Sequence, residues 1–161
     1  MIRIGVTGHS NLSVESTALV FGGLQDALQP HVGDGLHGIT CLAVGADQLF
    51  ARAILSLGGQ YDVILPAHDY REKGVKPDNL ADFEALIAGA SDVQFMPFQT
   101  SGREAYMAAS ERLVTRSDRL LAVWDGKPSG GLGGTADVVA HARKVGVPVE
   151  VVWPTGARRR S

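Results

Sequence analysis

Short apolar runs alternate with longer amphipathic stretches along the whole chain. The apolar runs are rich in Val, Ile and Leu and are mostly uninterrupted by polar residues, as expected of parallel strands that are covered on both faces. They span residues 2–7, 39–44, 61–66, 93–96, 119–124 and 147–153. The pattern therefore predicts six strands.

The stretches between these runs have apolar residues at helical spacing. They span residues 14–28, 46–57, 79–88, 104–115 and 135–145. Ser13, Asp78 and Thr135 stand at predicted helix starts and belong to the residue types that cap helix N-termini. Strand–helix alternation of this kind predicts an α/β fold, a three-layer α/β/α sandwich around a mainly parallel sheet of about six strands.

The composition is that of an ordinary soluble globular protein of one domain. The chain has 161 residues, of which 45% are hydrophobic and 20% charged. We expect a single domain over residues 1–154, because the Pro-Thr-Gly sequence at 154–156 ends the last strand. Residues 155–161 contain three arginines and are predicted to form a basic disordered tail. Contact of these arginines with nucleic acid or anionic lipid is the less favoured alternative.

Charge and cysteine content narrow the function classes. The formal net charge of −2 argues neither for nucleic-acid binding nor against a small anionic ligand, and we expect no nucleic-acid partner. Cys41 is the only cysteine, which rules out an internal disulfide and a cysteine-based zinc cluster, and the five histidines have no metal-binding spacing. No apolar run approaches the roughly 18 residues of a membrane span, and no signal peptide precedes the first strand. We expect a cytoplasmic protein that does not contact membranes.

A glycine-rich segment, GGLGGT at residues 130–135, lies between a predicted strand and a predicted helix. Such a turn leaves backbone N–H groups unpaired, and glycine lets an anion approach without Cβ clashes. Together with the positive end of the helix dipole, these N–H groups favour phosphate. Gly133, Gly134 and Thr135 are therefore candidate phosphate-binding residues, and a flexible surface loop is the alternative.

Two other loops follow predicted strands. Gly8 permits a sharp turn after the first strand, and His9 and Ser10 place an imidazole and a hydroxyl there. After the second strand, Gly45 would let a ligand approach the backbone, and the Asp47 carboxylate would suit a ribose hydroxyl. The alternatives are an incidental loop histidine at position 9 and an aspartate that only complements the helix dipole at position 47.

The remaining candidates are more dispersed. Tyr70 would stack on a base and Arg71 would meet a phosphate, unless their segment is a mobile surface loop. Lys127, after the fifth strand, is a further phosphate partner, and Tyr106 is a weaker addition. No P-loop spacing and no nucleophile–base pair is present, so we assign no catalytic residue and no metal ligand. Mg²⁺ would fit near Asp125 alongside a polyphosphorylated ligand.

Three of these motifs together resemble the SLOG superfamily. They are GHS at 8–10, VGADQLFA at 44–51, and AVWDG at 122–126 leading to GGT at 133–135. The superfamily includes the LOG cytokinin-activating phosphoribohydrolases and the DprA-type Rossmann domains, and the resemblance spans residues 2–153. It implies a Rossmann-like sheet with the first and fifth strands adjacent. It also implies that a nucleotide or nucleotide-derived ligand binds between the first-strand loop and the glycine-rich loop.

The chain departs from the LOG enzymes at one informative position. Their motif, Pro-Gly-Gly-x-Gly-Thr-x-x-Glu, ends in a glutamate that takes part in cleaving the N-glycosidic bond. Here Val138 occupies that position, and Asp137 stands one residue early, which turns its carboxylate by about 100° on a helix. We therefore expect a binding protein that acts as a sensor or carrier.

Two alternatives from other classes stay open. One is a nucleoside-monophosphate phosphoribohydrolase in which Asp137 or Glu104 replaces the missing glutamate. The other is an interaction module that docks through the helix around Ala105, Ala108 and Ala109. We also expect a homo-oligomer, because Rossmann domains of the group that the chain resembles often self-associate. Arg103, before the fifth strand, could supply a cation.

Overall fold

The computed structural model describes residues 1–129 and 131–160; Gly130, in the predicted glycine loop, and Ser161, in the predicted tail, lie outside the described residues. One six-stranded sheet runs through the molecule in the order β4-β3-β2-β1-β5-β6, and every neighbouring pair is parallel. The strands are β1 (Ile2–Gly8), β2 (Leu36–Thr40), β3 (Gln60–Leu65), β4 (Asp92–Phe95), β5 (Arg119–Val123) and β6 (Val149–Val151). The predicted parallel sheet is confirmed.

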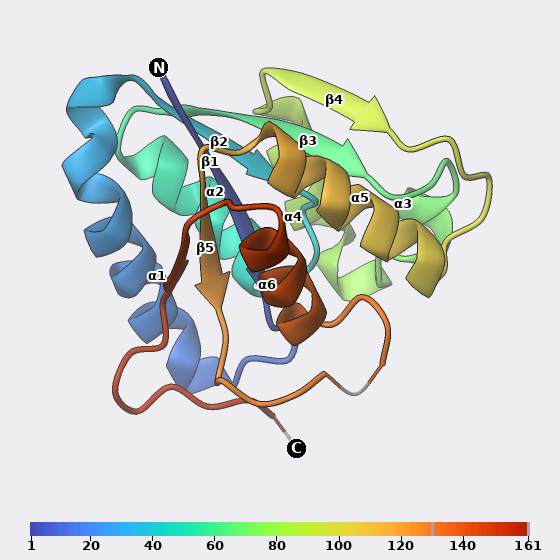
Figure 1. Cartoon of the computed structure of the whole chain (residues 1–161). Helices are drawn as coiled ribbons and strands as arrows, with labels where there is room; N and C mark the ends of the chain where they lie inside the picture. Colours follow the sequence, from blue (N-terminus) through green and yellow to red (C-terminus); the bar gives the residue numbers. More distant parts are fainter. Residues whose placement is uncertain (130, 161) are drawn as a thin grey trace.

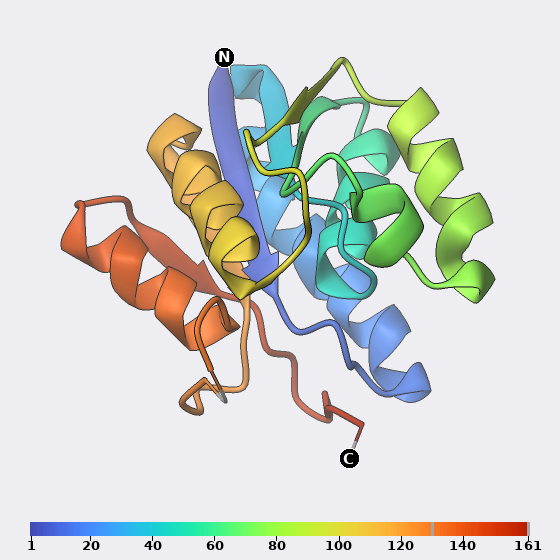
Figure 2. The ribbon, with the colours of Figure 1, turned by 90° about the vertical axis from the view of Figure 1, so that its right-hand side faces the viewer.

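Helices cover both faces of the sheet. They are α1 (Val14–Leu28), α2 (Ala46–Ser56), α3 (Tyr70–Lys73), α4 (Leu80–Ala88), α5 (Arg103–Arg116) and α6 (Thr135–Lys144), with 3₁₀ turns η1 (Gln29–Asp34) and η2 (Pro77–Asn79). Figures 1 and 2 show α5 and α6 on one face and α1, α2 and α4 on the other, which confirms the predicted three layers. Within residues 1–129 and 131–160, no helix has the length and apolar character needed to cross a bilayer.

Each helix packs on the sheet through an apolar stripe. On α1 the residues Ser16, Val20, Leu24 and Leu28, four apart in sequence, are buried, as expected of an amphipathic helix. On α5, Ala105 and Ala109 retain only 2% and 1% of their exposed surface because they face the sheet. These two positions are therefore covered within the domain, whereas Ala108 is half-buried, and docking through this helix stays a prediction.

The second strand ends earlier than its apolar pattern predicts. Leu42 has a positive φ of 57°, which ends extended structure, and its side chain is only 1% exposed. The Leu42 N–H donates to Thr40 Oγ1 at 3.1 Å, and Gln48 Nε2 donates to the Leu42 carbonyl at 3.1 Å. Leu42 is thus an apolar residue buried in a loop, so the apolar run continues past the end of the strand.

Of the three predicted caps, one is confirmed. The Ser13 hydroxyl accepts the Ser16 N–H at 3.3 Å at the start of α1. Asp78 lies inside η2, and Thr135 is the first residue of α6, with Gly134 in the cap position. Thr135 thus belongs to the first helical turn, and its side chain has another partner.

The sheet order positions the candidate site. From β1 the chain moves outward through β2, β3 and β4, and it then returns to the other side of β1 as β5. Gly8 at the end of β1 pairs with Val123 at the end of β5, so the first and fifth strands are adjacent as expected. Ligands of open α/β sheets bind beyond the carboxyl ends of the strands at this reversal.

Residues 157–160, within the segment predicted to be a disordered tail, lie along the loop after β1. The Ser13 N–H donates to the Arg158 carbonyl at 2.9 Å, and the Arg160 N–H donates to the Asn11 carbonyl at 2.6 Å. We call residues 157–160 the arginine strap. Backbone hydrogen bonds hold it rather than apolar side chains, which is why the composition gave no sign of it.

Candidate functional site

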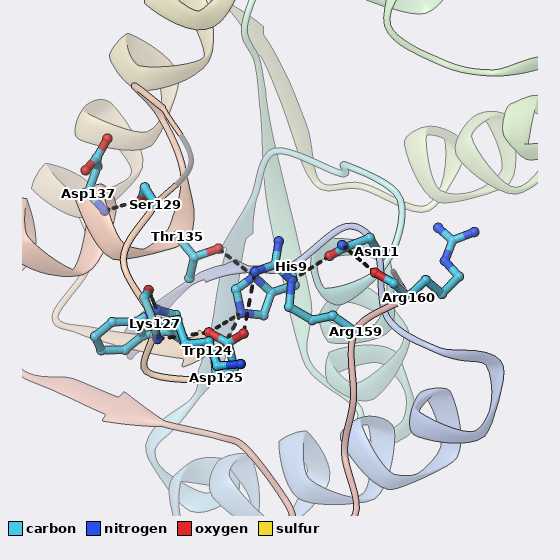
Figure 3. Close-up of polar contacts among 10 residues, drawn as sticks. All are labelled: His9, Asn11, Trp124, Asp125, Lys127, Ser129, Thr135, Asp137, Arg159 and Arg160. Carbon is cyan, nitrogen blue, oxygen red and sulfur yellow. Dashed lines mark hydrogen bonds and ion pairs between the residues drawn. The ribbon is translucent and has the colours of Figure 1, made fainter.

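His9 is the residue on which the elements of the site converge (Figure 3). It directly follows β1, and its side chain is 6% exposed. Its N–H donates to the Val123 carbonyl at 3.1 Å, and its carbonyl accepts the Ala46 N–H at 3.2 Å. The backbone of His9 is therefore fixed between the end of β5 and the start of α2.

The imidazole ring contacts three further segments. Nε2 accepts the Asp125 N–H at 3.0 Å, and Nδ1 lies 3.4 Å from Thr135 Oγ1. The Trp153 ring packs edge-on against the imidazole with 5.6 Å between centroids. Because Nε2 acts as an acceptor, the geometry assigns the proton of the neutral ring to Nδ1, where it faces Thr135.

The charge states of His9 and Asp125 follow from their surroundings. Burial lowers the pKa of His9, and the Arg159 charge lowers it further against the opposing effect of the Asp125 carboxylate 3.3 Å away. Burial acts to raise the pKa of Asp125. The Lys127 N–H, His9 and Arg159 together outweigh that effect, so the pKa of Asp125 is lowered. The pair is thus a neutral imidazole beside a carboxylate.

Part of the glycine loop is held by its own helix. Asp137 Oδ2 accepts the Gly133 N–H at 3.1 Å, and the Asp137 N–H donates to Ser129 Oγ at 3.2 Å. The Gly134 N–H donates to the Gly131 carbonyl at 3.3 Å. Two of the N–H groups that the sequence assigns to phosphate therefore have intramolecular partners.

The next two N–H groups along the chain differ from these. The N–H groups of Thr135 and Ala136, in the first turn of α6, have no acceptor among residues 1–129 and 131–160. A Cβ built on Gly131 would lie 1.8 Å from Arg103 Nη1, so the Arg103 guanidinium rests against the glycine loop. The start of α5 thus places a positive charge against the glycine loop that leads into α6.

Asp47 is buried at the carboxyl edge of the sheet. Its Oδ2 accepts the Ala43 N–H at 3.2 Å. Burial raises the pKa of Asp47 to about 7, and the Ala43 hydrogen bond opposes this only in part. An ionisable group buried with so little compensation is typical of a functional site.

Tyr70 lies near Asp47 and packs against Tyr106. Their rings meet edge-on with 6.0 Å between centroids. Burial raises the pKa of Tyr70, and the nearby Asp47 charge raises it further. Tyr70 is 7% exposed and Tyr106 is 37% exposed, so Tyr106 is the ring of the pair that presents a surface to a ligand.

Gly8 and Gly45 serve close packing in the structure. A Cβ on Gly8 would lie 2.5 Å from the Ala46 Cβ. Gly45 has φ 92°, and a Cβ there would lie 2.7 Å from the His9 carbonyl oxygen. Both glycines let the loop after β1 press against the start of α2, and protein atoms occupy the space beside them.

The other predicted residues lie at the surface. The Arg71 side chain pairs with Glu84 and lies 3.7 Å from Glu72. Ser10 and Lys127 are exposed. Lys127 follows β5 close to Asp125, and its N–H donates to Asp125 Oδ1 at 3.0 Å.

Sequence reasoning missed the contribution of the chain's other end. Trp153 packs on the His9 ring, and Arg159 Nη1 lies 3.5 Å from Asp125 Oδ2. Nothing local in the sequence marks these long-range partners, although a tryptophan just beyond the last strand lies at the same edge of the sheet. In the part of the chain that the structure describes, no group of three or more His, Cys, Asp or Glu residues could hold a metal ion.

No family model and no curated protein matches the chain, but solved structures share its fold. DNA processing protein A (DprA) from Streptococcus pneumoniae matches with a TM-score of 0.69 and 14% identity, over 94% of this chain and 50% of that one. DprA from Helicobacter pylori matches with a TM-score of 0.64 and 14% identity, over 93% of this chain and 64% of that one. The molybdenum cofactor binding protein from Rippkaea orientalis matches with a TM-score of 0.60 and 20% identity, over 93% of this chain and 75% of that one.

At these identities the similarity shows the fold alone. The Rossmann-like fold that the three motifs indicated is confirmed. This chain spans half of the pneumococcal DprA structure.

Proposed function

We propose that the protein binds a nucleotide or nucleotide-derived phosphorylated ligand between the loop after β1 and the glycine loop, as a sensor or carrier. One observation carries the proposal: the N–H groups of Thr135 and Ala136, at the strand-order reversal, have no acceptor within residues 1–129 and 131–160, and the Arg103 guanidinium lies against Gly131 of the same loop. A helix N-terminus and an arginine are the two groups that proteins most often combine to hold phosphate.

The similar structures support a ligand-binding role. One is described as a molybdenum cofactor binding protein, and another is described for its single-stranded DNA binding mode. Single-stranded DNA is a polymer of nucleotides. The net charge of −2 of this chain favours a small ligand over the polymer.

The geometry refines the expected contacts. Because Asp137 engages the Gly133 N–H, the phosphate would sit on Thr135 and Ala136. Asp47 receives one hydrogen bond, from Ala43, and its remaining lone pairs suit the hydroxyls of a ribose. Tyr106, more exposed than Tyr70 and His9, would face the base.

A thermal-shift screen against nucleotides, cyclic nucleotides and nucleoside monophosphates tests the proposal. Ligand at about 100 times its Kd adds about 2.7 kcal/mol of stability, a shift of several degrees for a domain of this size. In calorimetry of a hit, Thr135→Glu should abolish binding and Arg103→Ala should weaken it. Arg112→Ala removes an exposed arginine from the same helix and should bind normally. A folded Thr135→Glu protein with unchanged affinity would remove the glycine loop from the site.

Chromatography of each hit separates binding from hydrolysis. The Asp137 carboxylate lies at the glycine loop, so it is the group on which the hydrolase alternative rests. Recovery of intact ligand supports a sensor or carrier. Release of free base, lost in Asp137→Asn, would instead identify a phosphoribohydrolase. Light scattering of the same samples tests the expected homo-oligomer.

A further inference from the structure

The arginine strap and the loop after β5 enclose a hollow at the carboxyl edge of the sheet. Its volume is about 460 Å³, within the range of small-molecule sites. Asn11, Asp125, Lys127, Trp153 and Arg159 line it. In Figure 3, Asn11 and Thr135 lie on opposite sides of the His9 ring, so the hollow and the glycine loop are two separate places.

The lining is strongly cationic. Lys127 and the three arginines of the strap, residues 158–160, face a single carboxylate, that of Asp125. The whole chain carries a net charge of −2, so this concentration of positive charge is local. A concave cationic surface raises the local concentration of anions.

Arg159 is held in place with donors to spare. Its Nε donates to Asn11 Oδ1 at 2.9 Å and its Nη1 to Asp125 Oδ2 at 3.5 Å. Its backbone forms an antiparallel bridge with Leu12. A guanidinium has five N–H donors in a fixed fork, so three stay available to a ligand. Because the Arg159 side chain is already held in place, ligand binding does not incur the entropic cost of ordering it.

Lys127 is fixed in a similar way through its backbone. Its N–H donates to Asp125 Oδ1 at 3.0 Å, and its carbonyl accepts Trp124 Nε1 at 2.9 Å. Within residues 1–129 and 131–160, its ammonium group has no acidic partner. The loop thus presents a second cation to the hollow.

We propose that this hollow is a second anion site, in which Arg159 and Lys127 bind the phosphoryl groups of a pyrophosphate-type anion. Arg159 supplies a planar fork and Lys127 a compact charge, a combination that suits adjacent phosphoryl oxygens. The site stands independently of the glycine loop, because no residue of that loop lines the hollow.

Titration with inorganic pyrophosphate tests the proposal, by calorimetry and by the tryptophan fluorescence of the wild-type protein, in which Trp124 still holds the Lys127 carbonyl. Lys127→Ala and Arg159→Gln should each weaken binding about ten-fold or more, the effect of losing one charge-assisted contact. Gln at position 159 keeps a donor for Asn11, and thermal melts check that the strap variants fold. Arg112→Ala, with the same loss of charge outside the hollow, should bind normally.

The glycine-loop variant separates this proposal from the proposed function. Pyrophosphate binding that tolerates Thr135→Glu but not Lys127→Ala supports the second site, whether or not any nucleotide binds. If a nucleoside diphosphate also binds in Thr135→Glu but not in Lys127→Ala, a nucleotide is the source of the phosphoryl groups. Binding lost only in Thr135→Glu would place the anion on the glycine loop and overturn the second site. If pyrophosphate shows no saturable binding, the second site is overturned. A protein that binds single-stranded oligonucleotides more tightly as their length increases, but does not bind pyrophosphate, would overturn it as well.

Discussion

The Nε2 atom of His9 accepts the backbone N–H of Asp125 at 3.0 Å, while the carboxylate of the same aspartate lies 3.3 Å from that nitrogen. A neutral ring takes the amide as its partner, and a protonated ring would take the carboxylate. The contact that joins the end of β1 to the loop after β5 therefore depends on the protonation state of one histidine.

We predict that His9 makes stability fall on acidification. Because the pKa of His9 in the folded protein lies below its ordinary value of 6.5, its stabilising effect is present above that value. It is lost as the pH falls through the folded pKa. The His9→Gln variant retains a donor and an acceptor but does not titrate. Urea unfolding should show wild type losing stability relative to His9→Gln between about pH 7.5 and about pH 5. A difference that is constant with pH would contradict the assigned neutral ring.

Asp47 should have the opposite pH dependence. Its pKa rises from 3.8 to about 7 on folding, so the protonated carboxyl stabilises the fold below 3.8 and this effect is lost as the pH rises through about 7. Asn at this position keeps an acceptor for the Ala43 N–H without the buried charge. At about pH 8, Asp47→Asn should be more stable than wild type by up to about 4 kcal/mol, and the gain should shrink towards acid pH.

The same substitution also tests function. If Asp47 holds the sugar hydroxyls of the ligand, Asp47→Asn should bind more weakly while it unfolds at higher temperature. A gain in stability with a loss of affinity is expected where a protein keeps an unfavourable group for its function. Unchanged affinity would limit Asp47 to its contact with Ala43.

The elements of the fold were predictable because they follow from local patterns. The helix α1 was predicted with its observed bounds, Val14–Leu28, since its buried residues recur every fourth position. The place of the glycine loop followed from glycines between a strand and a helix. The end of β2 was not predictable in this way, because the loop around the buried Leu42 is as apolar as a strand.

The site was predictable only in part, since its contacts are long-range. His9 was identified from its place after a strand. Its partners Trp153 and Arg159 come from the other end of the chain, and no spacing rule connects them. Gly8 and Gly45 suggested an approaching ligand, but glycine is equally required where backbone approaches backbone, and the sequence does not distinguish the two.

Gly8 and Gly131 offer a direct comparison between these two roles. A Cβ on Gly8 would lie 2.5 Å from the Ala46 Cβ and 2.7 Å from the Val123 Cβ. Both neighbours are buried in the core, so Gly8→Ala should destabilise the protein by about 1–3 kcal/mol. A Cβ on Gly131 would instead meet the end of the flexible Arg103 side chain. Gly131→Ala should therefore melt close to wild type but bind phosphorylated ligand more weakly. Equal melting temperatures for the two variants would contradict the packing role of Gly8.

Asp137 provides the sharpest test of the glycine loop. Its carboxylate accepts the Gly133 N–H at 3.1 Å and places a negative charge at the start of α6, where the proposed phosphate would sit. Asp137→Asn keeps an acceptor for that N–H but removes the charge, which should cost about 0.3–1 kcal/mol of helix stabilisation. The repulsion of a bound phosphate disappears with the charge, so the affinity should rise. A change of about 0.3–1 kcal/mol in binding free energy corresponds to a rise of about 2- to 5-fold. Calorimetry with the nucleotide identified in the screen measures the change, and Asp26→Asn on α1 controls for net charge. An affinity that falls or stays constant would place the phosphate away from Asp137, whereas turnover in wild type that disappears in Asp137→Asn would assign the carboxylate to catalysis.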